Sequence, residues 1–317
     1  MARAARILGA KGAPMSDRAS VPEPARSLDR RTFVALSGAA SAVAGSLTPT
    51  LAQVEGLGRP HPPLVAEDDP AISVARPQIR RANRILESYY AAPRTAAPTT
   101  PAVVVVQHVW GVDAQLRDTV RRFAKEGYIA LAPDLYSGLG APNGDGSTDI
   151  ALFRPFADKL SDDVVDADLA AAAAFISAGA GGARQKIGVV GFCMGGSIAL
   201  RQTVDSTGTF AAAAVFYGKV RYGTTGNNGA ITPIALAYAD RIGTPLCGSW
   251  GANDTSILAA DVRALEARLQ QTNKPHDVRV YDGAGHAFFD DTRASYGPNA
   301  ASDAWTRTLA WFKQYLT

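Results

Sequence analysis

From about residue 101 to the C-terminus, short apolar runs alternate with longer segments whose apolar side chains recur at helical spacing. Residues 103–106 are four valines, and such a continuous run is typical of a strand buried on both faces of a sheet. Apolar side chains then recur at helical spacing over residues 116–124, and Gly127 stands where a C-cap glycine is expected. This alternation predicts a mostly parallel, doubly wound sheet with helices on both faces.

The same alternation continues through the rest of the chain. Further strands are predicted at residues 128–132, 187–190, 211–217, 245–250 and 278–281. Further helices are predicted at residues 165–176, 194–200, 258–269 and 305–316. Two loop-rich insertions, residues 136–159 and 219–241, interrupt the rhythm, and we expect them to line the mouth of a pocket. We therefore assign residues 101–317 to one catalytic domain.

Residues 53–100 have a different pattern, rich in proline and alanine and without a long periodic segment. We expect this stretch to be an N-terminal extension that wraps over the surface. Its one regular piece is residues 84–91, which predict an antiparallel edge strand.

Residues 1–52 are predicted to be an export signal that precedes the folded protein. Arg30 and Arg31 precede a weakly apolar run, and residues 50–52 form a small-x-small site that predicts a mature start at Gln53. This stretch resembles a bacterial twin-arginine export signal. The resemblance predicts the twin-arginine export machinery as a partner and a periplasmic or secreted location. The alternative is a membrane anchor, but glycine and proline within the run make it a poor one, so no stable membrane insertion is expected after cleavage.

Charge and composition narrow the class of protein. The chain has 317 residues, of which 47% are hydrophobic and 19% charged, with a formal net charge of +3, and this favours a globular protein. Seven of the 32 Lys and Arg and three of the 29 Asp and Glu lie in residues 1–52, which leaves 25 bases and 26 acids, a net charge of −1. That balance gives no electrostatic reason to expect nucleic acid or an anionic membrane as a partner. Two cysteines provide no disulfide framework, and Cys247 is expected to be a core residue in a strand.

The candidate chemistry begins at residues 186–200, KIGVVGFCMGGSIAL. A short strand, the sequence G-F-C-M-G and a small-residue helix have the form of a nucleophile elbow with Cys193 as the nucleophile. Gly191 and Gly195 remove Cβ atoms that would collide at so sharp a turn. The thiol would lie at a helix N-terminus, where the dipole favours a thiolate.

An activated cysteine needs a base, and the base needs an orienting group. Asp254 and His286 each follow directly after a predicted strand, at the sheet edge where sites of α/β proteins gather. The order nucleophile, acid, histidine is that of the α/β-hydrolases. Taken singly, Asp254 could be an ordinary turn residue and His286 part of a capped surface loop.

Five stretches of the chain together resemble the dienelactone hydrolase family of α/β-hydrolases. They are VVVVQHVWGVDAQLRD, EGYIALAPDLYSG, GFCMGG, GANDT and GAGHAFFDDTRASYG. The resemblance implies an α/β-hydrolase fold, a small-molecule ester or lactone substrate, and neither a cofactor nor a metal. It implies Cys193 as nucleophile, His286 as general base and acid, and Asp254 as its orienting carboxylate. It also implies that the backbone N–H groups of Val109 and Met194 form the oxyanion hole, which agrees with the donors that a helix N-terminus offers.

Trp110 and Tyr217 would line the pocket by position, although either aromatic side chain could belong to the core.

Two positions depart from the family pattern. His108 stands where the family has a glutamate beside the resting thiol, and a protonated imidazole lowers the pKa of a neighbouring thiol. We therefore expect His108 to tune the nucleophile, the alternative being a neutral imidazole turned to solvent or to a backbone carbonyl. Asp290 stands where dienelactone hydrolases have an arginine that binds the substrate carboxylate, although Arg293 or Arg154 could bring a cation to the site. An ester or lactone other than dienelactone is the expected substrate.

Two other function classes remain open on the residues alone. An exported protein with a low-pKa cysteine could act in thiol exchange or peroxide reduction, but the chain has no C-x-x-C motif. A non-catalytic binding protein on a hydrolase scaffold is the third class, and the presence of all three candidate catalytic residues argues against it.

Overall fold

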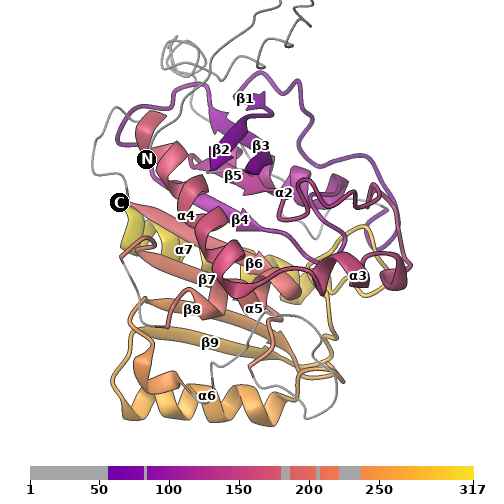
Figure 1. The fold of residues 1–317 in the computed structure, drawn as a ribbon. Coiled ribbons are helices and arrows are strands. Elements are labelled where there is room, and N and C mark those ends of the chain that lie inside the picture. The colour runs from indigo at the N-terminus through magenta and orange to yellow at the C-terminus, as the bar shows by residue number, and fades with distance from the viewer. Residues whose placement is uncertain (1–55, 82–83, 180–185, 205–207, 221–235, 237) are drawn as a thin grey trace, which may run out of the picture.

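The computed structural model describes residues 56–81, 84–179, 186–204, 208–220, 236 and 238–317. Among these residues the strands form one nine-stranded sheet in the order β1-β3-β5-β4-β6-β7-β8-β9, with β2 paired to β3 off this path (Figure 1). The strands are β1 (Ile72–Ala75), β2 (Gln78–Arg81), β3 (Arg84–Pro93), β4 (Ala102–Val106), β5 (Ile129–Pro133), β6 (Ile187–Phe192), β7 (Ala212–Phe216), β8 (Leu246–Gly251) and β9 (His276–Tyr281). The strands from β4 to β9 pair in parallel, which confirms the mostly parallel sheet.

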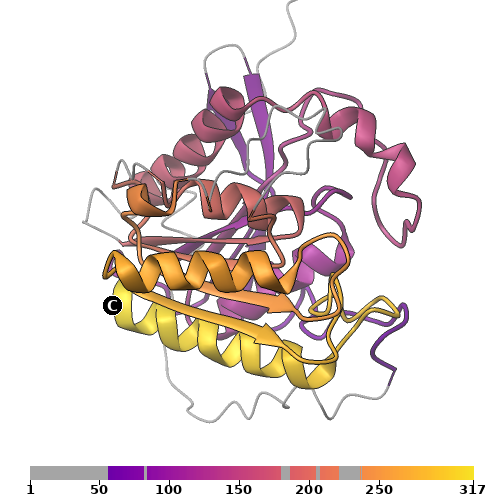
Figure 2. The same cartoon turned by 90° about the horizontal axis from the view of Figure 1, so that it is seen from below.

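Helices cover both faces of this sheet. They are α2 (Ala114–Lys125), α3 (Arg154–Ala157), α4 (Asp162–Gly179), α5 (Met194–Arg201), α6 (Ala259–Gln271) and α7 (Pro298–Leu316), with 3-10 turns η2 (Ile150–Leu152) and η3 (Ala239–Arg241). Phe123 of α2 packs its ring against Trp305 and Phe312 of α7, so these two helices share a face. Arg201 of α5 pairs with Asp166 of α4 on the other face. Figure 2 shows α6 and α7 on opposite sides of the sheet. This is the α/β-hydrolase arrangement that the sequence predicted.

The extension before the catalytic domain contributes more to the sheet than its sequence predicted. The strand expected at residues 84–91 is β3 and is antiparallel, but it does not lie at the edge. β5 pairs with residues 88–91 of β3 on one side, β1 pairs with residues 90–93 on the other side, and β2 pairs with residues 84–87. β1 and β2 are only four residues long, which is too short for a period of two to be recognised.

One boundary in the second half of the chain also differs from the prediction. Leu258 was expected on the buried face of the helix, but it is the N-cap of α6 and is 58% exposed. Its ψ of 130° is extended, so the helix begins one residue later. Val262, Leu265 and Leu269 are buried as expected. Cys247 is buried in β8, which confirms its assignment to the core.

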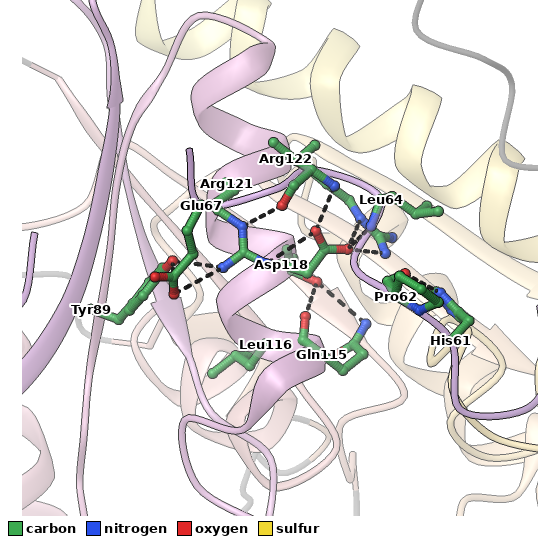
Figure 3. Close-up of polar contacts among 12 residues, drawn as sticks. His61, Pro62, Leu64, Glu67, Tyr89, Gln115, Leu116, Asp118, Arg121 and Arg122 are labelled. Atoms are coloured by element: carbon green, nitrogen blue, oxygen red, sulfur yellow. Dashed lines mark hydrogen bonds and ion pairs between the residues drawn. The ribbon is translucent and has the colours of Figure 1, made fainter. Parts of the chain in front are cut away.

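A buried group of charged side chains holds the segment before β1 against α2 (Figure 3). Asp118 of α2 accepts hydrogen bonds from the backbone N–H groups of Leu64 at 3.2 Å and Val65 at 2.9 Å. Arg121 donates to the carbonyl of Val65. The neighbouring Arg122 donates both to Asp118 and to Asp291, which lies in the loop after β9. Hydrogen bonds therefore hold the N-terminal segment to α2, and buried ion pairs hold α2 to that loop.

The predicted export signal, residues 1–52, lies outside the described residues. Within the described ranges, none of the helices combines the length and apolar composition that crossing a membrane requires.

Candidate active site

Cys193 lies at the sharp turn between β6 and α5. Its backbone has φ 55° and ψ −114°, a strained conformation that persists only where the surroundings impose it. A Cβ atom on Gly191 would lie 1.9 Å from the carbonyl oxygen of Gly195, and one on Gly195 would lie 2.3 Å from that of Val106. Both glycines are therefore required by close backbone contacts, as expected for a nucleophile elbow.

The structure brings the predicted acid and base together in direct contact. Nδ1 of His286 lies 2.6 Å from Oδ2 of Asp254. The other oxygen, Oδ1, accepts hydrogen bonds from the N–H of Ser256 at 2.8 Å, its hydroxyl at 2.7 Å and the N–H of Ile257 at 3.1 Å. These three donors fix the buried carboxylate and leave Oδ2 free to orient the imidazole.

The pKa shifts at this site favour a thiolate beside an imidazolium. Burial acts to raise the pKa of Cys193, but interactions with His286 and His108 outweigh burial and lower it. Burial acts to lower the pKa of His286, but hydrogen bonding to Asp254 and the interaction with Cys193 raise it to about 10. The lowered pKa of Cys193 and the raised pKa of His286 both favour the thiolate, which is the nucleophilic form of cysteine.

The two residues predicted to form the oxyanion hole lie on either side of one tyrosine. Val109 sits in a tight turn after β4, which the N–H of Gly111 closes by donating to the carbonyl of His108 at 3.2 Å. The Tyr136 hydroxyl donates to the carbonyl of Val109 at 2.8 Å and lies 3.9 Å from the sulfur of Met194. The N–H of Met194, at the start of α5, also helps to lower the pKa of Cys193.

His108 is buried and faces a carboxylate rather than solvent. Its side chain is 5% exposed, and its Nε2 lies 3.3 Å from Oδ1 of Asp113. Burial is the largest single influence and acts to lower its pKa, but the charge and close contact of Asp113, together with the charges of Asp290 and Cys193, outweigh burial and raise it. The alternative of an imidazole turned to solvent does not describe this side chain.

Comparison with known proteins places these residues in a family. The model of the dienelactone hydrolase family matches residues 86–316. This chain belongs to the dienelactone hydrolase family. A carboxymethylenebutenolidase homologue from Salmonella typhimurium is 36% identical over 254 residues, which is 80% of this chain and 92% of the relative. A second homologue, from Methylorubrum extorquens, is 32% identical over 292 residues, or 91% of this chain and 94% of the relative.

A solved structure gives the same result. A dienelactone hydrolase homologue from Klebsiella pneumoniae superposes with a TM-score of 0.69 at 35% identity, covering 77% of this chain and all of that one. The chain is therefore a carboxylic ester or lactone hydrolase with the α/β-hydrolase fold.

This family member carries a neutralised cation beside the predicted pocket residue Trp110. The guanidinium of Arg293 lies 3.6 Å from the centre of the Trp110 ring. Nε of Arg293 donates to Asp290 at 2.6 Å. Asp290 also accepts from the N–H and the hydroxyl of Thr292. Of the two cations considered from the sequence, Arg293 lies against Trp110, whereas Arg154 is exposed at the start of α3.

A pocket of about 440 Å³ lies between Trp110 and the first insertion. Its lining includes Glu87, Asp134, Tyr136, Gly138 and residues 140–144. The first insertion therefore lines a pocket next to the turn that carries Val109, and the lining of that pocket includes none of Cys193, Asp254 and His286. Most of the second insertion, residues 221–235 and 237, lies outside the described residues.

Tyr217 is placed differently from Trp110. It is 3% exposed, and its ring lies 5.2 Å from that of His286 and 5.3 Å from that of Phe288. Tyr217 therefore packs beneath the histidine as part of the core, and it does not line the pocket at Trp110.

Three residues that touch this site were not identified from the sequence as functional. Asp113 pairs with His108, Ser256 donates to Asp254, and Tyr136 contacts both predicted oxyanion donors. The position of Asp113 directly before a helical pattern is visible in the sequence, but an aspartate there is typical of a helix N-cap. No cluster of three metal-ligating side chains occurs within the ranges that the structure describes.

Proposed function

We propose that this hydrolase cleaves its ester or lactone through an acyl-cysteine intermediate. Cys193 is the nucleophile, His286 the general base and acid, and Asp254 the carboxylate that orients the imidazole. The observation that carries the proposal is the 2.6 Å contact between His286 and Asp254 at the site of a cysteine held in a strained elbow. The lowered pKa of Cys193 supports the same roles.

Acylation follows from these groups. The Cys193 thiolate attacks the carbonyl carbon, and the carbonyl oxygen becomes an oxyanion. The N–H groups of Val109 and Met194 would donate to that oxygen. When the tetrahedral intermediate collapses, the C–O bond to the leaving oxygen breaks, and the His286 imidazolium gives that oxygen its proton.

Deacylation uses the same groups in reverse. Neutral His286 takes a proton from water, the resulting hydroxide attacks the thioester carbonyl, and the C–S bond breaks. The acid product leaves, and the thiolate and the imidazolium are restored. Asp254 stabilises the imidazolium through both steps and is not itself protonated.

The substrate is proposed to be a neutral ester or lactone rather than one with a free carboxylate. Binding a carboxylate requires a cation with free donors. Arg293 lies next to Trp110, but its Nε is bound to Asp290, and the pair leaves little net charge for a ligand. This supports a substrate preference different from that expected of a dienelactone hydrolase with an arginine at the position of Asp290.

The acyl-cysteine proposal is tested by trapping. The wild type mixed with p-nitrophenyl acetate and quenched in acid should carry one acetyl group, located by peptide mass spectrometry on Cys193. Cys193→Ala should form no adduct and lose essentially all turnover. Cys247→Ala is the matched control, because Cys247 is buried in β8 and burial raises its pKa to about 12. Wild-type turnover by Cys193→Ala would refute the assignment.

The same experiment separates the other function classes. A redox protein would lose its alkylation-sensitive thiol on peroxide treatment but would release no p-nitrophenol in a Cys193-dependent burst. A binding protein on a hydrolase scaffold would show neither the burst nor the adduct.

A further inference from the structure

His108 and the residue that faces it form a second imidazole–carboxylate contact in the site. Nε2 of His108 lies 3.3 Å from Oδ1 of Asp113, and both side chains are almost completely buried. The contact is an ion pair without hydrogen-bond geometry, since within the described part of the chain neither ring nitrogen of His108 has a hydrogen-bond partner. The ring is fixed by an edge-on contact with Trp110 at 5.3 Å. Asp113 therefore acts on the imidazole through its charge, and the burial of both side chains limits the screening of that charge by water.

We propose that Asp113 and His108 act as a second carboxylate–imidazolium pair, which presents a positive charge to Cys193 and holds the nucleophile as a thiolate in addition to His286. The inference rests on the proposed function, in which Cys193 is the nucleophile. Asp113 is then a positioning residue, because it acts through His108 and not on the substrate.

The charged groups around His108 come from three parts of the fold, and most of them favour its protonated form. Asp113 precedes α2, Asp290 lies in the loop after β9, and Cys193 stands at the elbow; each raises the pKa of His108, against the effect of burial. Arg293 is the opposing cation, but it lowers the pKa of Asp113 and so keeps that carboxylate ionised.

The backbone that carries His108 lies against the nucleophile elbow, because a Cβ atom on Gly195 would lie 2.5 Å from the carbonyl oxygen of Gln107. The charged groups around Cys193 also have opposing effects on its pKa. His286 and His108 lower its pKa, in that order, against the effect of burial. The hydroxyls of Tyr136 and Tyr217 are also close enough to feel its charge, but burial raises the pKa of both phenols, so they are neutral at ordinary pH. Of the groups that bear on the thiol, the two imidazoles are therefore the ones that can carry a positive charge.

The role of Asp113 as a helix cap does not by itself explain why this residue is an aspartate. Asp113 is the N-cap of α2, and its Oδ1 accepts from the N–H of Leu116 at 2.9 Å. Asparagine caps a helix as well as aspartate does, so the cap does not require a carboxylate. The negative charge is needed only for the group beside it, the imidazole of His108.

Because asparagine also caps helices, Asp113→Asn tests the charge of this side chain separately from its role as a helix cap. Asp113→Asn removes the charge and keeps the cap, so α2 should remain folded. His108 then loses its main source of charge stabilisation and becomes neutral at a lower pH. A nearby full charge shifts a pKa by about 1–3 units, so the loss of this charge should raise the midpoint of Cys193 alkylation by about one pH unit.

The measurement is the rate of iodoacetamide alkylation of Cys193 against pH, read by peptide mass spectrometry. The wild type is compared with Asp113→Asn, His108→Gln and the double variant. The control is Asp145→Asn, which removes a carboxylate that pairs with Arg117 of the same helix at 2.8 Å. We expect the three test variants to share one raised midpoint, because both single substitutions abolish the same charge, and the control to match the wild type.

Two outcomes overturn the proposal. Superimposable profiles for Asp113→Asn and the wild type would show that the carboxylate does not act on the thiol. Additive shifts in the double variant would show that the two residues act separately. Alkylation needs no turnover, so these outcomes are distinct from failure of the proposed function, which would appear as an absent acetyl adduct on wild-type Cys193.

Discussion

Replacing Asp254 by asparagine tests the proposed catalytic geometry most directly. The side chain is held by the two donors of Ser256 and by the N–H of Ile257. An asparagine side chain can accept the same hydrogen bonds through its carbonyl oxygen, so the fold should not change. What changes is the group that faces Nδ1 of His286, from an acceptor to an NH₂ donor.

The size of the effect follows from that exchange. With a donor facing Nδ1, the stable tautomer of His286 carries its proton on Nε2, and the imidazole can no longer take a proton from the thiol. The hydrogen bond to Asp254, the largest of the contributions that raise the pKa of His286 to about 10, is lost as well. In a triad, this substitution lowers kcat by about 10⁴-fold, which corresponds to about 5.4 kcal/mol of lost transition-state stabilisation.

The assay is steady-state hydrolysis of p-nitrophenyl acetate, with kcat and KM determined separately. We expect kcat to fall while KM changes little, because the lost interaction is made in the transition state. The control is Asp282→Asn, an exposed aspartate four residues before His286, which should retain wild-type kcat. If Asp254→Asn retained wild-type kcat, the orienting role would be wrong, and a fall in kcat for Asp282→Asn would move it there.

Three further predictions concern substrate, stability and export. Asp290→Asn should free the donors of Arg293, and kcat/KM for a carboxylate-bearing lactone should rise about tenfold relative to a neutral ester, as one charge-assisted hydrogen bond allows; an unchanged ratio would argue against Arg293 facing the substrate. Arg122→Met should remove the guanidinium shared by the buried carboxylates of Asp118 and Asp291 and lower the free energy of unfolding in urea by about 3–5 kcal/mol, whereas a wild-type midpoint would show that these ion pairs are dispensable. We also propose twin-arginine export: a reporter fused to the predicted leader should reach the periplasm, and Arg30→Lys with Arg31→Lys should block it, so equal export of the double variant would make the pair incidental.

The elbow could be predicted from the sequence because its constraints are local. Gly191 and Gly195 lie two residues on either side of Cys193, and the contacts that exclude their Cβ atoms involve the turn itself and the strand beside it. Asp254 and His286 could be predicted because each directly follows a strand, and parallel strands place their carboxyl ends at one edge. The order nucleophile, acid, histidine along the chain then predicted the role of each residue.

The charged pairs could not be predicted in the same way, because they depend on which segments meet in space. In the sequence, Asp118 and Arg122 form an i, i+4 pair of the kind usually exposed on a helix. In the structure they are buried, because the segment before β1 lies across them and Asp291 joins them from 169 residues away. The contact of Asp113 with His108 could not be predicted either, because an aspartate before a helix is explained by its role as an N-cap.

The loop after β9 connects these separate observations. It carries His286, continues to Asp290, which contributes to the charge state of His108, and reaches Asp291, which binds Arg122 of α2. Because Asp291 pairs with Arg122 of α2, the loop cannot shift without breaking a buried ion pair. A base must hold its geometry to within a fraction of an ångström to be effective. The buried charges on α2 therefore restrain the position of the proposed catalytic histidine, although they take no part in the chemistry.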